Sequence, residues 1–229
     1  MSGQKNWNNL YEAINAMNQT SPCLVLRNYE DMSNDNYFMK GHDDIDFLCE
    51  NQQEIVRVLD ARKNVYWGSP DHFIVKINGK DIKFGLRYIG DGYYDALWER
   101  RMLENRILVQ NTFYVMSKEN YFYSLLYHAL FQKQKVADDY RARLTVMGRE
   151  LGLEVSSDKE FLDCLISYLE LNKYTVEYPS DPTVPIHYND VPSNLLGESF
   201  GWKIKRLLFK PRWKIHNISR KMEGRIKHG

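Results

Sequence analysis

The sequence has few cysteines and no long apolar run, and both absences exclude classes of protein. Its 229 residues include three cysteines, Cys23, Cys49 and Cys164, which are odd in number, far apart and without a C-x-x-C pattern. This spacing argues against a disulfide framework or a zinc site and favours buried thiols. No apolar run approaches the ~20 residues of a membrane-spanning helix, and MSGQKNWNNL has no signal-peptide apolar region. We therefore expect a cytoplasmic protein.

The chain also lacks the short motifs of several enzyme classes. It contains no Walker-type glycine-rich loop, no G-x-S-x-G elbow and no Cys-His nucleophile spacing, so hydrolase mechanisms have little support. What it does have is 43% hydrophobic residues, enough for a sizeable core in a chain of 27.2 kDa. A globular protein is expected, either as one medium domain or as one domain with an appendage.

Positive charge is concentrated in residues 201–229, which we call the basic tail. The tail carries ten Lys or Arg and one acid, whereas residues 1–200 carry 21 bases and 29 acids. Apolar residues at helical spacing predict an amphipathic helix. Such a helix could pack on the acidic body, or lie with Trp202 and Trp213 on an anionic membrane surface, which would make the protein peripheral at the inner membrane face. Nucleic acid is the least favoured partner.

Residues 1–92 mix helical and strand patterns. The pattern predicts a helix at 4–18, a strand at 21–29, a strand at 44–50, a helix at 51–62 and two strands at 72–79 and 80–90. The last two strands meet at Asn78-Gly79, and Asn-Gly is the strongest short-range hairpin signal. This order predicts an α+β fold with a mixed sheet and flanking helices.

After about residue 90 we expect helices only. Helices are predicted at 93–105, 117–134, 137–151 and after a capping box at 157–160. Three prolines follow in YPSDPTVPIHYND and predict an irregular connector. The expected domains are therefore an α/β half at 1–92, a helical half at 93–178, and the connector with the basic tail at 179–229.

The stretch GHDDIDFL raises the question of function. On a strand, Asp44 and Asp46 lie on one face ~6 to 7 Å apart at Cα, while Ile45 and Phe47 point into the core. Two such carboxylates are stable mainly when a cation bridges them, and an oxygen-only site suits Mg²⁺ with waters and substrate phosphates. Without metal, repulsion should raise the pKa of one acid. The alternative is a pair of solvated or ion-paired surface acids.

The order of LRNYED, GHDDIDFLCE, GLRYIGDGYYDALWERRMLENR and YFYSLLYHALFQK, over about residues 20–145, resembles nucleotidyltransferase-fold proteins of the DNA polymerase β superfamily. The group it resembles is associated with bacterial polysaccharide and capsule synthesis. The resemblance implies that Asp44 and Asp46 are catalytic and hold one or two Mg²⁺ ions. It also implies a nucleoside triphosphate and a small acceptor, such as a sugar or sugar phosphate, as substrates.

Two departures from that group bear on activity. Its phosphate-binding Gly-Ser turn is replaced by Arg27-Asn28-Tyr29, so Arg27 is a candidate phosphate ligand or a salt-bridge partner of a nearby acid. The position expected for a third acid is Gly85, which has no side chain to bind metal. Asp81 and Asp91 are candidate substitutes, both off the expected register.

Two further residues belong to the candidate site. Arg87, on the strand face of Gly85, could bind a phosphate or pair with the aspartates, and His42 could bind phosphate or cap the strand. Two hypotheses follow for the whole chain. It is a Mg²⁺-dependent nucleotidyltransferase, or it is a catalytically silent protein of that fold that binds a nucleotide or a glycan-synthesis partner.

Overall fold

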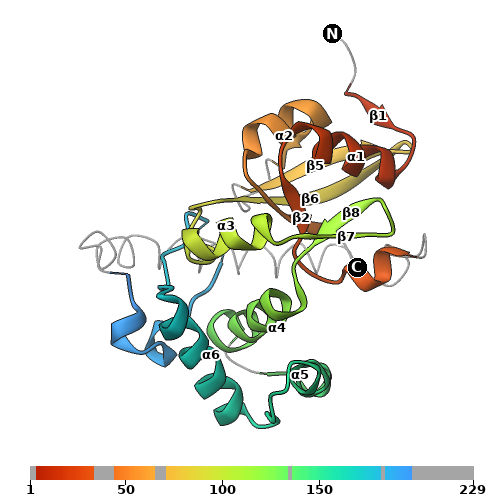
Figure 1. Ribbon diagram of the computed structural model, residues 1–229. Coiled ribbons are helices and arrows are strands. Elements are labelled where there is room, and N and C mark those ends of the chain that lie inside the picture. Colours follow the sequence, from red (N-terminus) through yellow and green to blue (C-terminus); the bar gives the residue numbers. More distant parts are fainter. Residues whose placement is uncertain (1–3, 34–43, 65–70, 134–135, 182–183, 198–229) are drawn as a thin grey trace, which may run out of the picture. The chain divides into compact units, whose positions relative to one another are not determined.

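The computed structural model describes residues 4–33, 44–64, 71–133, 136–181 and 184–197. These form two compact units (Figure 1). The first takes in the described residues up to 64, those of 71–91 and those of 96–121, and the second takes in 92–95 and the described residues from 122 onward.

The first unit is built on a mixed sheet that has eight strands within the described residues. In chain order they are β1 (Asn6–Trp7), β2 (Cys23–Val25), β3 (Asp44–Cys49), β4 (Arg62–Lys63), β5 (His72–Ile77), β6 (Lys80–Tyr88), β7 (Ile107–Val109) and β8 (Phe113–Val115). They lie in the order β1-β5-β6-β3-β2-β8-β7, with β4 on β5. β3 runs parallel to β6, whereas β5 with β6 and β2 with β3 are antiparallel. The predicted α+β class with a mixed sheet is confirmed.

Helices α1 (Leu10–Thr20) and α2 (Gln52–Leu59) cover one face of this sheet (Figure 1). Each begins at an asparagine, Asn9 or Asn51, whose side chain accepts the backbone N–H three residues on. Their buried side chains join those of the strands in one core. It includes Ile14, Met17, Ile55, Leu59, Ile45, Phe47, Val75 and Phe84. The core therefore fixes which face of β3 and β6 is left for polar residues.

The hairpin of β5 and β6 turns at Asn78-Gly79, as predicted. Both residues have positive φ, 48° and 74°, which is the conformation that a two-residue turn of this kind requires. The turn fixes the register of the pair, from Ile77 opposite Lys80 to His72 opposite Gly85. This register determines which residues of β5 and β6 lie side by side in the candidate site.

Two sequence predictions about secondary structure were wrong. The first helix begins at Leu10 and not at residue 4, because Asn6–Trp7 pairs with β5 and the Trp7 indole donates to the Leu59 carbonyl over 3.2 Å. Residues 107–115 form the β7–β8 hairpin and not a helical region, with Val115 paired to Val25. Strands of three residues are too short to show periodicity in a sequence.

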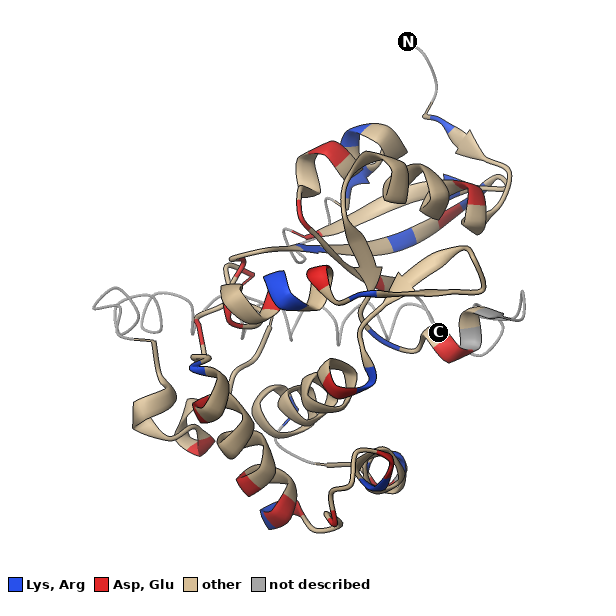
Figure 2. Cartoon of the chain, viewed as in Figure 1, with Lys and Arg blue, Asp and Glu red and all other residues tan. Residues whose placement is uncertain are grey.

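The second unit is helical. Besides most of α4 (Lys118–Tyr127) it contains a π-helical turn at His128–Gln132, α5 (Asp138–Glu150) and α6 (Asp158–Asn172). The predicted capping box at the start of α6 is confirmed, because Ser157 and Glu160 each accept the other's backbone N–H. α6 carries four acids and one lysine, so its exposed surface is acidic (Figure 2).

The basic tail and its predicted helix lie outside the described residues. None of the helices described is both long and apolar enough to cross a membrane.

Candidate functional site

The polar face of the first unit's sheet brings together residues from three adjacent strands. Asp44 pairs with Lys83 and Asp46 pairs with Gly85 across β3 and β6, and Gly85 pairs with His72 across β6 and β5. Residues directly opposite one another in a sheet share a face. On β3 the intervening Ile45 and Phe47 are buried in the core, as the alternation in the sequence predicted.

Asp44, Asp46 and His72 form a group that could hold a metal ion. Each offers one ligand atom, and these three atoms lie within 4.8 Å of one another. All three residues are partly exposed, so the group is open to solvent. Donors around one ion at 2.0–2.1 Å lie ~3 to 4 Å apart, so small side-chain movements would bring the three onto a divalent cation. The donor set therefore fits a divalent cation, with a histidine added to the two carboxylates expected from the sequence.

His72 was missed by the sequence analysis, although the sequence contains a signal for it. The Asn78-Gly79 turn was recognised, and counting outward from a two-residue turn sets His72 opposite Gly85. Only the parallel pairing of β3 with β6, which joins Asp46 to Gly85, was not predictable from local sequence.

Gly85 lies directly against the Asp46 carboxylate. A Cβ atom at Gly85 would be 2.2 Å from Asp46 Oδ1, far inside van der Waals contact. The Asp46 side chain thus occupies the space that a side chain at Gly85 would need. An acid at this position would have to displace Asp46.

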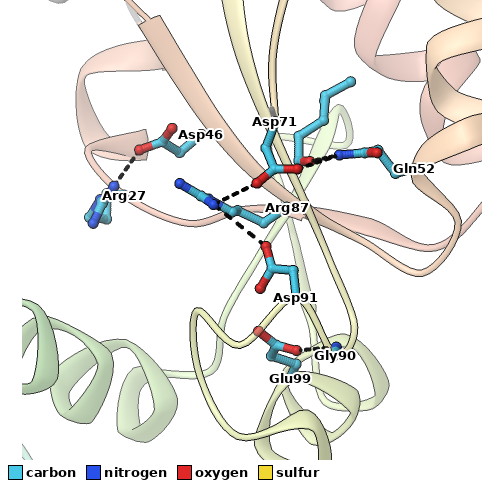
Figure 3. A network of polar contacts seen from close by, with 9 residues as sticks. Arg27, Asp46, Gln52, Asp71, Arg87, Gly90, Asp91 and Glu99 are labelled. Atoms are coloured by element: carbon cyan, nitrogen blue, oxygen red, sulfur yellow. Dashed lines mark hydrogen bonds and ion pairs between the residues drawn. The ribbon is translucent and has the colours of Figure 1, made fainter. Parts of the chain in front are cut away.

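Arg27 is placed beside Asp46, and the structure shows the salt-bridge alternative for it. Its Nη2 donates to Asp46 Oδ2, and the two side chains are 15% and 21% exposed (Figure 3). The backbone sets this contact, because the N–H of Leu26 donates to the carbonyl of Asp46 over 2.9 Å. Arg27 is therefore held next to the ligand group whether or not it also contacts a phosphate.

The pKa values of the two aspartates shift in opposite directions. Burial raises the pKa of Asp44 above its ordinary value, and the negative charge of Asp46 adds to this shift. Burial would also raise the pKa of Asp46, but the charge and hydrogen bond of Arg27, with the charges of Arg87 and His72, lower it. The upward shift expected for one member of the pair is thus found at Asp44, with burial contributing more than repulsion. A cation would favour the ionised form of both acids.

Arg87 belongs to a second polar group, which we call the Arg87 centre and which consists of Arg87, Asp71, Asp91 and Gln52 (Figure 3). Arg87 Nη1 donates to Asp71 Oδ2 over 2.8 Å and lies 3.7 Å from Asp91 Oδ2. Gln52 Nε2 donates to Asp71 Oδ1 over 3.1 Å. Arg87 and both acids are buried, and the charge of Arg87 also reaches Asp46.

The other sequence candidates lie elsewhere. Asp91 is buried beside Arg87, and Asp81 forms an exposed ion pair with Arg62. Within the described part of the chain, neither belongs to the ligand group of Asp44 and Asp46. His42 lies outside the described residues.

Comparison with known proteins gives one structural similarity. No family model matches this chain, and no curated protein matches it. Among solved structures, the chain is similar to the antibiotic-resistance factor ANT(2'')-Ia, with 12% sequence identity, a TM-score of 0.36, and coverage of 71% of this chain and 92% of that one. A similarity at this level carries no functional argument, and the assignment of function rests on the site itself.

Proposed function

We propose that the protein is a nucleotidyltransferase that uses a divalent cation, Mg²⁺ in the first instance, to move a nucleoside monophosphate from a triphosphate to a small acceptor. The observation that carries this proposal is the placement of Asp44 and Asp46 on the open face of β3, within metal-ligand reach of each other. Burial and repulsion oppose ionisation of Asp44, and a bound cation would reverse that. The sequence resemblance adds the reaction class and suggests a sugar or sugar phosphate as acceptor.

Three residues of the site have a part in the proposed reaction. Asp44 and Asp46 would hold one or two ions, which when bound stabilise charge on the phosphates and lower the pKa of the attacking hydroxyl. Arg27 orients the Asp46 carboxylate. Its guanidinium has five N–H donors, so it can also present donors to a phosphate oxygen beside Asp46. The acceptor hydroxyl oxygen would form a bond to the α-phosphorus, the bond from that phosphorus to the bridging oxygen of pyrophosphate would break, and the hydroxyl proton would pass to solvent.

A second candidate is a catalytically silent protein of the same fold that binds a nucleotide or a glycan-synthesis partner. Two observations favour it. Arg27 neutralises part of the charge on Asp46 without metal, and the position expected for a third acid is Gly85. Loss of a ligand costs a factor of ten in rate for each ~1.4 kcal/mol of transition-state stabilisation lost.

Calorimetric titration with Mg²⁺ and each nucleoside triphosphate tests both candidates. Wild type is expected to bind at least one Mg²⁺-nucleotide, and Asp46→Asn should bind it more weakly. Asp81→Asn is the matched control, because Asp81 is an acid of β6 that pairs with Arg62 on the exposed surface. If wild type binds no nucleotide, the enzyme and the nucleotide-binding form of the silent protein are both wrong.

Turnover separates the two candidates. Triphosphates labelled at the α-phosphate are incubated with a panel of sugars and sugar phosphates, and label transfer and pyrophosphate release are measured. Transfer by wild type supports the first candidate, the enzyme. Loss of transfer in Asp46→Asn would place the active site at Asp46. Nucleotide binding by wild type without any transfer would instead identify the chain as the silent form.

Peripheral membrane contact through the basic tail stays a prediction. Flotation of the chain with anionic liposomes, with and without residues 201–229, tests it. Equal flotation of the two forms would exclude a membrane role for the tail.

A further inference from the structure

We propose that His72 is the third protein ligand of the cation site, that it reaches the cation across Gly85, and that its nitrogen makes the site prefer a first-row transition ion such as Mn²⁺ over Mg²⁺. This inference rests on the proposed function in one respect, the placement of a divalent cation at Asp44 and Asp46. It adds the identity of the third ligand and the class of metal.

The side chains of Asp46 and His72 approach each other across strand β6. Asp46, Gly85 and His72 are direct partners in one row across β3, β6 and β5. Neighbouring strands are ~4.8 Å apart, so the Cα atoms of Asp46 and His72 are separated by ~10 Å. Their ligand atoms nevertheless lie within 4.8 Å. Both side chains therefore extend over the strand between them.

Gly85 makes this approach sterically allowed. The Asp46 carboxylate lies where a side chain at Gly85 would begin, with Oδ1 2.2 Å from the position of a Cβ. A third ligand on β6 would fill the gap over which Asp46 and His72 approach each other. Moving that ligand one strand outward, to β5, requires the middle strand to have no side chain at this point. The glycine is thus part of the site and not only a lost acid.

Arg27 determines which carboxylate oxygen of Asp46 is available to a cation. The guanidinium takes Oδ2, while Oδ1 is the atom that lies over Gly85. The oxygen on the Gly85 side is therefore the one suited to a cation shared with His72. Arg27 and the cation can use different oxygens of one carboxylate, so the salt bridge does not by itself block the metal.

The donor set selects the class of ion. Mg²⁺ binds oxygen ligands almost exclusively and keeps several waters. Imidazole is a ligand of the first-row transition ions, and carboxylates suit Mn²⁺ as well as Mg²⁺. Two carboxylates with one imidazole therefore match Mn²⁺ better than they match Mg²⁺.

Electron paramagnetic resonance of Mn²⁺ tests this assignment without measuring activity. Mn²⁺ is titrated into the full chain, free ion is counted from its spectrum, and pulsed spectra are recorded for coupling to a ligand nitrogen. Wild type should bind Mn²⁺ at least about tenfold more tightly than Mg²⁺ in competition and should show nitrogen coupling. Labelling histidine with ¹⁵N should change that coupling.

Two variants test separately the role of His72 as a ligand and the role of the open space at Gly85. His72→Asn should lose the nitrogen coupling and most of the preference for Mn²⁺, while Mg²⁺ affinity stays nearly unchanged. Gly85→Ala should displace the Asp46 carboxylate and weaken Mn²⁺ binding by about tenfold or more. His187→Asn, in the second unit, is the control and should behave as wild type.

The outcomes distinguish this inference from the proposed function. Mn²⁺ bound without nitrogen coupling, or coupling that persists in His72→Asn, would overturn the role of His72 and leave nucleotidyl transfer intact. Unchanged binding in Gly85→Ala would overturn the role of the gap. If the chain binds neither Mn²⁺ nor Mg²⁺, with or without nucleotide, the proposed function itself is wrong.

Discussion

The Arg87 centre and the group of Asp44, Asp46 and His72 are two polar sites on one sheet with opposite characters. In the Arg87 centre the paired side chains of Arg87 and Asp71 are only 8% and 4% exposed, and Gln52 adds a hydrogen bond to the acid. In the second site the ligand residues are partly exposed and two acids lie side by side.

This difference is the one expected between a group that stabilises the fold and a group that binds a ligand. A buried ion pair is stable when hydrogen bonds satisfy its remaining donors and acceptors. Removing one partner leaves an uncompensated charge in the interior. Neighbouring acids that are partly exposed and whose pKa values shift in opposite directions are more typical of sites that bind or react. The degree of burial therefore distinguishes the two groups better than the presence of charged residues does.

The largest expected effect is on stability, at the Arg87 centre. Arg87→Ala should lower the free energy of unfolding by ~3 to 5 kcal/mol, because it leaves buried Asp71 uncompensated. Urea denaturation followed by circular dichroism measures this. The control is Arg62→Ala, which breaks an exposed pair with Asp81 and should cost no more than ~1 kcal/mol. Equal losses in the two variants would show that burial does not set the cost of breaking an ion pair in this protein.

The second prediction concerns Asp46, where we expect a large effect on activity and a smaller effect on stability. Asp46→Asn should reduce nucleotidyl transfer by ~100-fold or more, since a metal ion contributes several kcal/mol to the transition state. Its free energy of unfolding should fall by less than in Arg87→Ala, by ~1 to 3 kcal/mol, because the pair with Arg27 is mostly buried but an asparagine can still accept from the guanidinium. Single-turnover rates and urea titrations on the same samples measure both. A large loss of stability in Asp46→Asn would place Asp46 with the structural residues.

The smallest effect concerns the protonation of the metal-free site. The carboxyl carbon of Asp44 should titrate above the ordinary value of 3.8, and that of Asp46 below it. With its lowered pKa, Asp46 stabilises the fold above pH 3.8, and this contribution is lost as the pH falls through its folded pKa. Asp44 has the opposite sign, because its contribution is present at low pH and is lost as the pH rises through its raised pKa.

Carbon-detected NMR titration measures both values. Arg27→Met should raise the pKa of Asp46, because burial then acts without the guanidinium that opposes it. Identical titration of the two aspartates would contradict the asymmetry on which the comparison rests.

Local features of the fold were predictable from the sequence. The Asn78-Gly79 turn, the Ser157 capping box and the alternation around Asp44 and Asp46 each depend on residues a few positions apart. The same locality explains what was missed, since the β7–β8 hairpin has strands of only three residues. Periodicity needs longer segments to be recognised.

The partners of the charged residues were less predictable. Arg87 pairs with Asp71, which the sequence analysis did not consider, because that contact depends on the path of the chain into β5. His72 reaches Asp46 only because a parallel strand pair sets Asp46 beside Gly85. Register between strands that are distant in sequence is set by tertiary packing and leaves little local signal.

The cysteines provide a reporter for the strand that carries the two aspartates. Cys23 and Cys49 are direct partners across β2 and β3, and both are buried. Burial raises the pKa of Cys23 to about 12 and that of Cys49 well above its ordinary value, so neither forms thiolate readily. Cys164 on α6 is partly exposed. Alkylating reagents should therefore modify Cys164 in the native protein, while the modification rates of Cys23 and Cys49 record how often the sheet opens at β3.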